Sequence, residues 1–369
     1  MQVYDYKGKT KIYLCGDIHE DFKKLFFNLK GKITHDSNML IQKHPYKIEE
    51  DEEYSQSIGR YRMEDIGVPN FLSSISVEDG LVRRRGGKNK ELLYDNALLI
   101  CTGDCGFGIK SLEYYMGMLS RLNEILAKNN CTLLMIRGNI DNPQYFDGKT
   151  INFSHIKAIP DYSVILTKKH NILCIGGGIS IDRSWKKGHE KRLGGKTLYW
   201  ENEAPILDHD KLNEIFQSGI QINGVVSHSA PTSVPVNNDN GLKYWVEKDA
   251  SLEKDVQNER NILEELFSIL KKNKEDIVWW AFGHFHYHAY HMIDKTNFFS
   301  IPDSAYIASL EHELEKTKRV KLKMPNISSF MRWDVTYDPP RPHEEAAQVE
   351  IAPLEIVEDG PMDIARAEF

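Results

Sequence analysis

The sequence has few cysteines and no long hydrophobic run. Its 369 residues include five cysteines, an odd number that contains no CxxC pair. This pattern favours reduced structural thiols in a cytoplasmic protein over disulfides or a zinc site. No stretch approaches the ~20 apolar residues of a membrane-spanning helix, and the first residues, MQVYDYKGKTKIY, hold no apolar core of a secretory signal. We therefore expect a cytoplasmic protein without membrane association.

A strong charge of one sign is also absent from most of the chain. The formal net charge is −7. Residues 343–369 contain eight acids and one base, so this segment carries the whole −7 and residues 1–342 sum to zero. A neutral body lacks the electrostatic footprint of a general nucleic-acid-binding protein, and we expect no binding to long duplex nucleic acid. The 41% apolar and 27% charged residues exclude disordered, collagen-like and disulfide-scaffold classes.

Short apolar runs recur along the chain and predict buried strands, because they are rich in β-branched, aromatic or leucine residues. The runs are 11–15, 97–101, 131–136, 172–175, 222–226 and 277–282. Apolar residues at three- and four-residue spacing predict helices over 21–30, 110–128 and 258–272. Strands that alternate with helices indicate an α/β fold. Later runs predict an antiparallel continuation over 288–293, 297–301 and 331–337.

The domain organisation expected from these patterns is one domain over residues 1–338, followed by a tail. Within the domain, residues 35–92 have weak periodicity and contain an acidic stretch and then a basic one. We interpret this segment as a cap or insertion. Residues 339–369 open with Pro-Pro-Arg-Pro and continue acidic, which predicts a mostly disordered tail.

Five of the predicted strands end in Asp, Asn or His, residue types that commonly bind ligands. At four of these five strands the turn also contains glycine. In α/β sheets, ligands bind just beyond the carboxyl ends of the strands, and glycine lets the backbone turn sharply there. One such ending is compatible with a turn or a helix cap, but five that converge on one rim indicate a ligand site. The segments are Gly16-Asp17-Ile18-His19, Thr102-Gly103-Asp104, Arg137-Gly138-Asn139, Ser227-His228 and Gly283-His284-Phe285-His286.

The residue types at these strand ends predict a metal centre. Two aspartates, one asparagine and four histidines offer oxygen and imidazole donors without sulfur, a set that suits Mn, Fe, Zn, Ni or Co. Seven donors are too many for one ion and enough for two. Two metal ions can clamp a phosphoryl group and lower the pKa of a bridging water, so the set indicates phosphoryl chemistry.

In this order, the motifs resemble those of the calcineurin-like metallophosphoesterases, whose signature runs D-x-H, G-D, G-N-H-D/E, a lone H and G-H-x-H. The match extends over residues 12–286. The resemblance implies a four-layer α/β sandwich of two stacked mixed β-sheets flanked by helices, here with an insertion after the first βα unit. It implies two divalent cations, Mn²⁺ foremost, with Fe, Zn, Ni, Co or Mg as alternatives. It also implies that Asp17, His19 and His286 bind the first ion, that Asn139, His228 and His284 bind the second, and that Asp104 bridges both.

The chain departs from the family signature at one position. Ile140 stands where the family usually has a histidine that contacts the substrate and protonates the leaving oxygen, and isoleucine cannot donate a proton. The resemblance is therefore to a branch that lacks this histidine. Members of that branch include phosphodiesterases and a near-inactive protein-binding scaffold. Asp141 follows directly and is either a catalytic residue beside the metal ligands or an Asp that caps the turn before Asn142-Pro143.

A second glycine-rich ending, Gly176-Gly177-Gly178, leads into Arg183. We expect Arg183 to hold a substrate phosphate as a bidentate fork, with a tight turn as the alternative. Trp185, Tyr199 and Trp200 are more typical of a core than of a base-stacking platform, and His288 or His291 is a weaker candidate for the pocket.

The sequence thus predicts a dinuclear metal-dependent phosphoesterase that acts on a phosphodiester or phosphomonoester through a metal-bound hydroxide. The catalytic candidates are Asp104, Asn139, Asp141 and Arg183. The expected substrate is a phosphorylated small molecule, a nucleotide or a phosphoprotein, and a dinucleotide pyrophosphatase shares the same chemistry. The alternative is a catalytically weak metal-binding module that uses the fold as a protein-binding scaffold.

Overall fold

A computed structural model of the chain describes residues 1–22, 25, 96–192, 197–236, 242–303 and 307–315. All of them lie within the compact unit Met1–Thr317. The predicted insertion over 35–92, the predicted strand over 331–337 and the predicted tail over 339–369 lie outside the described residues, and they stay predictions.

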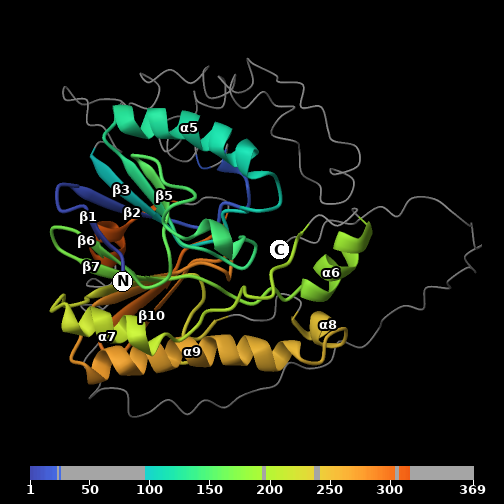
Figure 1. Cartoon of the computed structure of the whole chain (residues 1–369). Coiled ribbons are helices and arrows are strands. Elements are labelled where there is room, and N and C mark those ends of the chain that lie inside the picture. Colours follow the sequence, from blue (N-terminus) through green and yellow to red (C-terminus); the bar gives the residue numbers. More distant parts are fainter. Residues whose placement is uncertain (23–24, 26–95, 193–196, 237–241, 304–306, 316–369) are drawn as a thin grey trace, which may run out of the picture. The chain divides into compact units, whose positions relative to one another are not determined.

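Two β-sheets form the centre of the fold (Figure 1). The first has five strands in the order β12-β2-β3-β4-β5. Its strands are β2 (Lys11–Cys15), β3 (Ala97–Cys101), β4 (Thr132–Met135), β5 (Ile156–Ala158) and β12 (Ile307–Ser309). Strands β2 to β5 are parallel, and β12 joins β2 in antiparallel register.

The second sheet has seven strands in the order β1-β6-β7-β8-β9-β11-β10 and is also mixed. Its strands are β1 (Val3–Asp5), β6 (Ser163–Leu166), β7 (Asn171–Ile175), β8 (Gly224–Ser227), β9 (Trp279–Phe282), β10 (Ala289–Ile293) and β11 (Thr296–Ser300). The expected antiparallel continuation is confirmed for β10 and β11, whereas β11 itself pairs with β9 in parallel.

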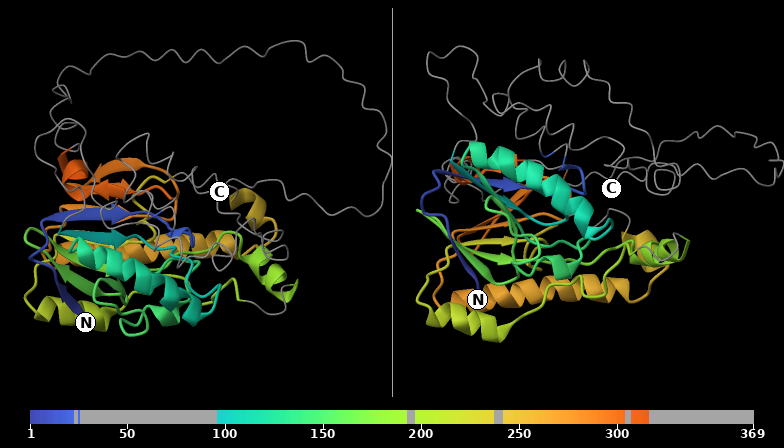
Figure 2. Two further views of the ribbon diagram at one scale, coloured as in Figure 1. Left: turned by 90° about the horizontal axis from the view of Figure 1, so that it is seen from above. Right: turned by 45° about the horizontal axis from the view of Figure 1, so that its top comes forward.

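Helices cover the outer faces of both sheets (Figures 1 and 2). Helix α5 (Leu112–Lys128) packs on the five-stranded sheet, and α7 (His209–Gln217) and α9 (Leu252–Lys272) pack on the seven-stranded sheet. Among the described residues, shorter elements include α6 (Arg183–Arg192), α8 (Leu242–Val246) and the 3₁₀ helix η2 (Pro143–Tyr145). The predicted α/β sandwich of two mixed sheets flanked by helices is therefore confirmed.

The strands are apolar on both faces, because each sheet is covered on both sides. Side chains alternate along a strand, so Ile12 and Leu14 of β2 enter the core between the sheets, while Tyr13 and Cys15 enter the core under α5. The side chains of strand β9 alternate in the same way, so Trp279 lies in the core between the sheets and Trp280 lies in the core under α7 and α9. Continuous apolar runs in the sequence are the signature of such doubly covered strands.

The first and last described strands are exchanged between the sheets. Strand β1 precedes β2 in the chain but pairs with β6 of the seven-stranded sheet. Strand β12 follows β11 in the chain but pairs with β2 of the five-stranded sheet. Among the described residues, no helix combines the length and the apolar character that a membrane crossing requires.

Candidate metal centre

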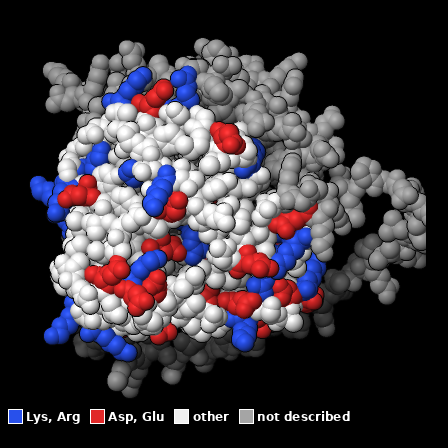
Figure 3. Space-filling view, viewed as in Figure 1, with Lys and Arg blue, Asp and Glu red and all other residues white. Residues whose placement is uncertain are grey.

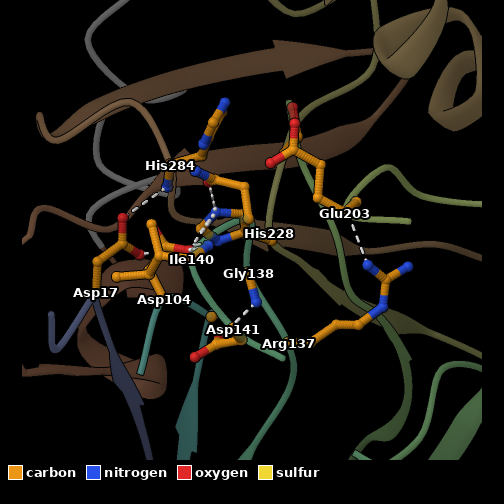
Figure 4. A network of polar contacts seen from close by, with 12 residues as sticks. Asp17, Asp104, Arg137, Gly138, Ile140, Asp141, Glu203, His228 and His284 are labelled. Atoms are coloured by element: carbon orange, nitrogen blue, oxygen red, sulfur yellow. Dashed lines mark hydrogen bonds and ion pairs between the residues drawn. The ribbon is translucent and has the colours of Figure 1, made fainter. Parts of the chain in front are cut away.

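The ends of five strands bring the seven predicted ligands together on one rim. The five-stranded sheet supplies four of them from the turns after β2, β3 and β4, and the seven-stranded sheet supplies three from the turns after β8 and β9. Figure 4 shows Asp17, Asp104, His228 and His284 close to one another. The predicted ligands after strands of the five-stranded sheet are Asp17, His19, Asp104 and Asn139, and those after strands of the seven-stranded sheet are His228, His284 and His286.

Several of these residues have left-handed backbone conformations. The φ angles are 51° at His19, 48° at Asp104, 68° at His284 and 59° at His286. L-residues other than glycine rarely adopt this region, and such strain clusters at functional sites, where it is compensated by surrounding structure. Here it turns each side chain back toward the rim directly after a strand.

Three glycines of the motifs leave space for a ligand from a neighbouring turn. A β-carbon on Gly103 would overlap the His228 ring, one on Gly138 would overlap the Asp104 carboxylate, and one on Gly283 would overlap Asp17 Oδ1. The glycine before each polar residue is therefore required by close packing between turns.

A first group of donors consists of Asp17, His19, Asp104 and His286, each of which offers an atom within 4.8 Å of the others. His286 Nε2 lies 3.3 Å from Asp17 Oδ2 and 3.2 Å from His19 Nε2. Asp17 Oδ1 is buried and has no hydrogen-bond partner in the described part of the chain. Buried polar atoms are nearly always paired, so this orphaned oxygen fits a site for a cation.

A second group centres on His228. Its Nδ1 lies 2.9 Å from the Thr102 carbonyl and donates its proton to that oxygen. Its Nε2 faces two oxygens, Asn139 Oδ1 at 2.9 Å and Asp104 Oδ1 at 3.3 Å. The His284 ring packs 4.9 Å from the His228 ring. Burial lowers the pKa of His228, but the neighbouring carboxylates of Asp104 and Asp17 prevail and raise it. The oxygen and imidazole atoms gathered here are of the types that also fit a divalent ion.

The charges in this rim are strongly coupled. Burial opposes ionisation of Asp104, yet the imidazoles of His228, His19 and His284 hold the pKa of its carboxyl well below the usual range. Burial lowers the pKa of His286, but its hydrogen bond and charge interaction with Asp17 prevail and raise it to about 9. His284 is affected in the opposite sense, because burial and the charge of His228 lower its pKa well below the usual value.

Asp141 lies directly behind the rim and faces backbone amides. Its carboxylate accepts hydrogen bonds from the N–H groups of Cys105, Gly106, Phe107 and Gly138, at 2.7 to 3.1 Å. Burial and the neighbouring Asp104 raise its pKa to about 7 against the effect of these amides. The structure therefore places Asp141 between the turns after β3 and β4 and not among the two groups of donors.

Arg183 is the first residue of α6, and its guanidinium group donates hydrogen bonds to two acidic side chains of this chain. Its Nε lies 2.6 Å from Asp249 Oδ2, and one Nη lies 2.7 Å from Asp255 Oδ2 and 2.8 Å from Ser251 Oγ. The contact lowers the pKa of Asp249 to about 2, chiefly through the hydrogen bond from Arg183. These contacts join α6 to the N-terminal region of α9.

The other residues singled out in the sequence have different surroundings. The Ile140 side chain is buried, and its backbone N–H donates to Asp104 Oδ1 at 3.1 Å. His288 pairs with Glu313 at 3.3 Å. Trp200 is buried, as expected of a core residue, whereas Trp185 is 40% exposed and stacks on His189.

Four buried polar residues beside the rim were not among the residues singled out as site candidates in the sequence. Glu259 on α9 accepts hydrogen bonds from Ile179 N and Ser229 Oγ. Ser180 contacts Asn139, and both Lys186 and Glu203 contact Ser180. Ser180 belongs to the glycine-rich ending that drew attention to Arg183, but Glu203 and Glu259 are ordinary acids in the sequence.

The chain is similar to a known protein family over most of its length. The family model for calcineurin-like phosphoesterase matches residues 10–288. No curated protein sequence matches the chain. Among solved structures, the phosphopantetheinyl hydrolase of Mycobacterium tuberculosis is similar over 59% of this chain and 88% of its own, with 11% sequence identity and a TM-score of 0.27.

Proposed function

Because this chain belongs to the calcineurin-like phosphoesterase family, a family of metal-dependent hydrolases, we propose that it is a dinuclear phosphoesterase that cleaves a phosphodiester or a phosphomonoester. The observation that carries the proposal is the position of Asp104. It belongs to the group with Asp17, His19 and His286, and its Oδ1 also lies 3.3 Å from His228 Nε2 in the second group.

In this proposal Asp17, His19 and His286 hold the first divalent ion, Asn139, His228 and His284 hold the second, and Asp104 bridges both. The bound ions would act as Lewis acids toward phosphoryl oxygens and water. The protein residues position the centre, and Gly103, Gly138 and Gly283 let the turns approach closely enough to share it. Mn²⁺ is the first candidate, with Fe, Zn, Ni, Co or Mg as alternatives.

Two of the catalytic candidates act in this proposal by positioning. Asp141 ties the turn that carries Asp104 to the turn that carries Asn139 through four backbone N–H groups. Arg183 anchors α6 on Asp249 and Asp255. Loss of either is expected to disturb the site through its geometry.

The substrate class we propose is a phosphorylated small molecule, a nucleotide or a phosphoprotein. Acidic and basic side chains are interspersed over the face seen in Figure 3, which disfavours long duplex nucleic acid there. All five cysteines are buried free thiols, which supports work in a reducing compartment such as the cytoplasm.

Ile140 favours a second candidate function, a metal-binding module with weak catalysis. Its buried apolar side chain stands beside Asp104 (Figure 4) and supplies no proton.

Hydrolysis of bis-p-nitrophenyl phosphate and of p-nitrophenyl phosphate, with Mn, Ni, Co, Zn or Mg added, separates these functions. We expect metal-dependent turnover that chelation abolishes, and the preferred ester distinguishes a diesterase from a monoesterase. Asp104→Ala should lose both activity and bound metal, because the bridge between the ions is removed. The matched control, Asp147→Ala, alters an aspartate that caps the turn to Thr150. Metal binding without turnover would favour the scaffold, and an Asp104→Ala protein with full activity and two ions would refute the assignment.

A further inference from the structure

Ser180 contacts the nitrogen of the Asn139 side-chain amide, whereas the oxygen of that amide faces His228. It follows β7 in the glycine-rich turn, and its side chain is buried. Its hydroxyl accepts hydrogen bonds from Asn139 Nδ2 and from Lys186 Nζ, both at 2.9 Å. It donates to Glu203 Oε2 at 2.6 Å.

The chemistry of these partners fixes the direction of each hydrogen bond. A hydroxyl has one proton and two lone pairs, a lysine ammonium only donates, and an ionised carboxylate only accepts. The proton of Ser180 therefore points to Glu203, and one lone pair is used by Lys186. The remaining lone pair can only accept, so Asn139 has to present its NH₂ group to Ser180. Its Oδ1 is then left to face His228 Nε2 at 2.9 Å.

Glu203 is held rigidly in the position from which it acts on Ser180. Its carboxylate is fully buried, and Oε1 accepts the backbone N–H of Ser180 at 2.9 Å. Arg137 donates to the backbone carbonyls of Glu203 and Ala204, at 2.7 and 2.9 Å, and so fixes this segment (Figure 4). Lys186 balances the charge and is itself paired with Asp182 at 3.1 Å.

We infer that Ser180 and Glu203 are positioning residues that determine which way round the Asn139 amide faces, and thereby present its oxygen to the second ion. The inference rests on the proposed function, because it takes Asn139 as a ligand of that ion. An amide turned by 180° would present NH₂, which cannot bind a cation. Outer partners of this kind orient ligands, and their loss typically costs 10–100-fold in metal affinity.

The substitution Glu203→Gln tests the inference with almost no change of shape. The backbone N–H of Ser180 keeps the new amide oxygen on its side, so the new NH₂ group points at the hydroxyl. The Ser180 hydroxyl then faces three donors, from Lys186, Asn139 and the substituted residue 203, but has only two lone pairs to accept with. Its own proton finds an acceptor only if the Asn139 side-chain amide turns by 180° and presents its oxygen. We expect the affinity for the second equivalent of Mn²⁺ to fall by about 10–100-fold, and that for the first to be unchanged. The measurement is calorimetric titration of the metal-free full chain with Mn²⁺ at about pH 8, where Glu203 is ionised.

Two further backgrounds distinguish orientation from general damage. Ser180→Ala removes the hydroxyl whose proton would be misdirected, so Ser180→Ala/Glu203→Gln should bind no more weakly than Ser180→Ala alone. In an Asn139→Asp background both ligand oxygens are equivalent, so Glu203→Gln should have no effect on affinity. Ser163→Ala is the matched control, because this buried serine of β6 also loses one hydrogen bond, to the Pro160 carbonyl.

Several outcomes would overturn the inference. One is wild-type affinity for both ions in the Glu203→Gln protein. A second is that Glu203→Gln lowers the Mn²⁺ affinity equally in the wild-type and Asn139→Asp backgrounds. A third is that Glu203→Gln lowers the affinity for both ions by an amount that Ser163→Ala matches. Should the Glu203→Gln protein fail to fold, Ser180→Ala with and without Asn139→Asp poses the same question. A wild-type chain that binds fewer than two ions would instead refute the proposed function, and with it the inference.

Discussion

Gly138 lies so close to Asp104 that a β-carbon on the glycine would overlap both the carboxylate and the backbone nitrogen of the aspartate. The two residues come from turns after different strands, β4 and β3, which are neighbours in one sheet. Their contact explains why a glycine precedes Asn139. The turn can pass beside the proposed bridging ligand only when that position has no side chain.

Gly138→Ala should therefore displace Asp104 and abolish metal binding. The backbone atoms that meet the new methyl group cannot rotate away, and the Gly138 N–H also donates to Asp141. We expect at least a 100-fold loss of activity, by analogy with catalytic groups displaced by about 1 Å. Gly117→Ala is the control, because Gly117 is exposed on α5 with nothing within 4 Å of a β-carbon, and it should stabilise the protein by about 1 kcal/mol. Normal metal content in Gly138→Ala would contradict the packing argument.

Ile140 should make hydrolysis depend strongly on the leaving group. Without a proton donor at this position, the leaving oxygen must carry its own negative charge, and general-acid catalysis is worth about 10²–10⁴-fold. We expect p-nitrophenyl esters to be cleaved far better than alkyl phosphate esters. A plot of log kcat/KM against leaving-group pKa should have a steep negative slope, and Ile140→His should reduce it. A flat line for the wild type would mean that another residue donates the proton.

Glu203 should give the metal-free protein a distinct pH dependence. Burial raises the pKa of its carboxyl to about 7, against the effects of Ser180 and Lys186. Because this folded-state pKa lies above the usual value of 4.5, the folded protein keeps the proton longer than the unfolded chain. The contribution of the Glu203 carboxyl to the free energy of unfolding is fully present below about pH 4.5 and is lost as the pH rises through about 7.

The corresponding measurement is chemical denaturation of wild type and Glu203→Gln between about pH 5 and pH 7.5. The free energy of unfolding of the wild type should fall relative to that of the variant by up to about 3 kcal/mol. A constant difference across this range would show that the carboxyl titrates normally.

Residues 35–92 should supply no metal ligand. All seven candidate ligands are at the ends of β2, β3, β4, β8 and β9, outside this segment. Replacement of residues 40–90 by a short Gly/Ser linker should keep metal binding and change substrate preference, as measured with the two nitrophenyl esters. A folded deletion variant that binds no metal would place part of the centre in this segment.

The fold was predictable where strands are covered on both faces. Strands β2 and β3 agree with their predicted bounds, since an uninterrupted apolar run between polar turns marks both ends. Strands β1, β5 and β12 have three residues each, too few for a periodic signal. Helix α9 begins at Leu252 and not at residue 258, because the charged residues of its first turns hide the apolar spacing.

The family and its metal-dependent chemistry were predictable because each candidate ligand closely follows a buried strand. The carboxyl ends of neighbouring parallel strands meet at one edge of a sheet, so the order of the motifs in the sequence indicates that they meet in space. Ser180 and Glu203 were not, because 23 positions separate them and only the folded chain brings the carboxylate to the hydroxyl. The fork of Arg183 on Asp249 and Asp255 is likewise a tertiary contact between distant segments. The positive charge of Arg183 does not indicate from the sequence which anionic group it binds.

The exchange of β1 and β12 between the sheets has a consequence for synthesis on the ribosome. One edge of β2 stays open until Ile307–Ser309 has emerged, although β2 itself is made long before β12. Strand pairing over such a separation is slow and leaves an edge exposed to wrong partners. The turn that carries Asp17 and His19 directly follows β2, so these two candidate ligands lie beside the strand whose pairing is completed last.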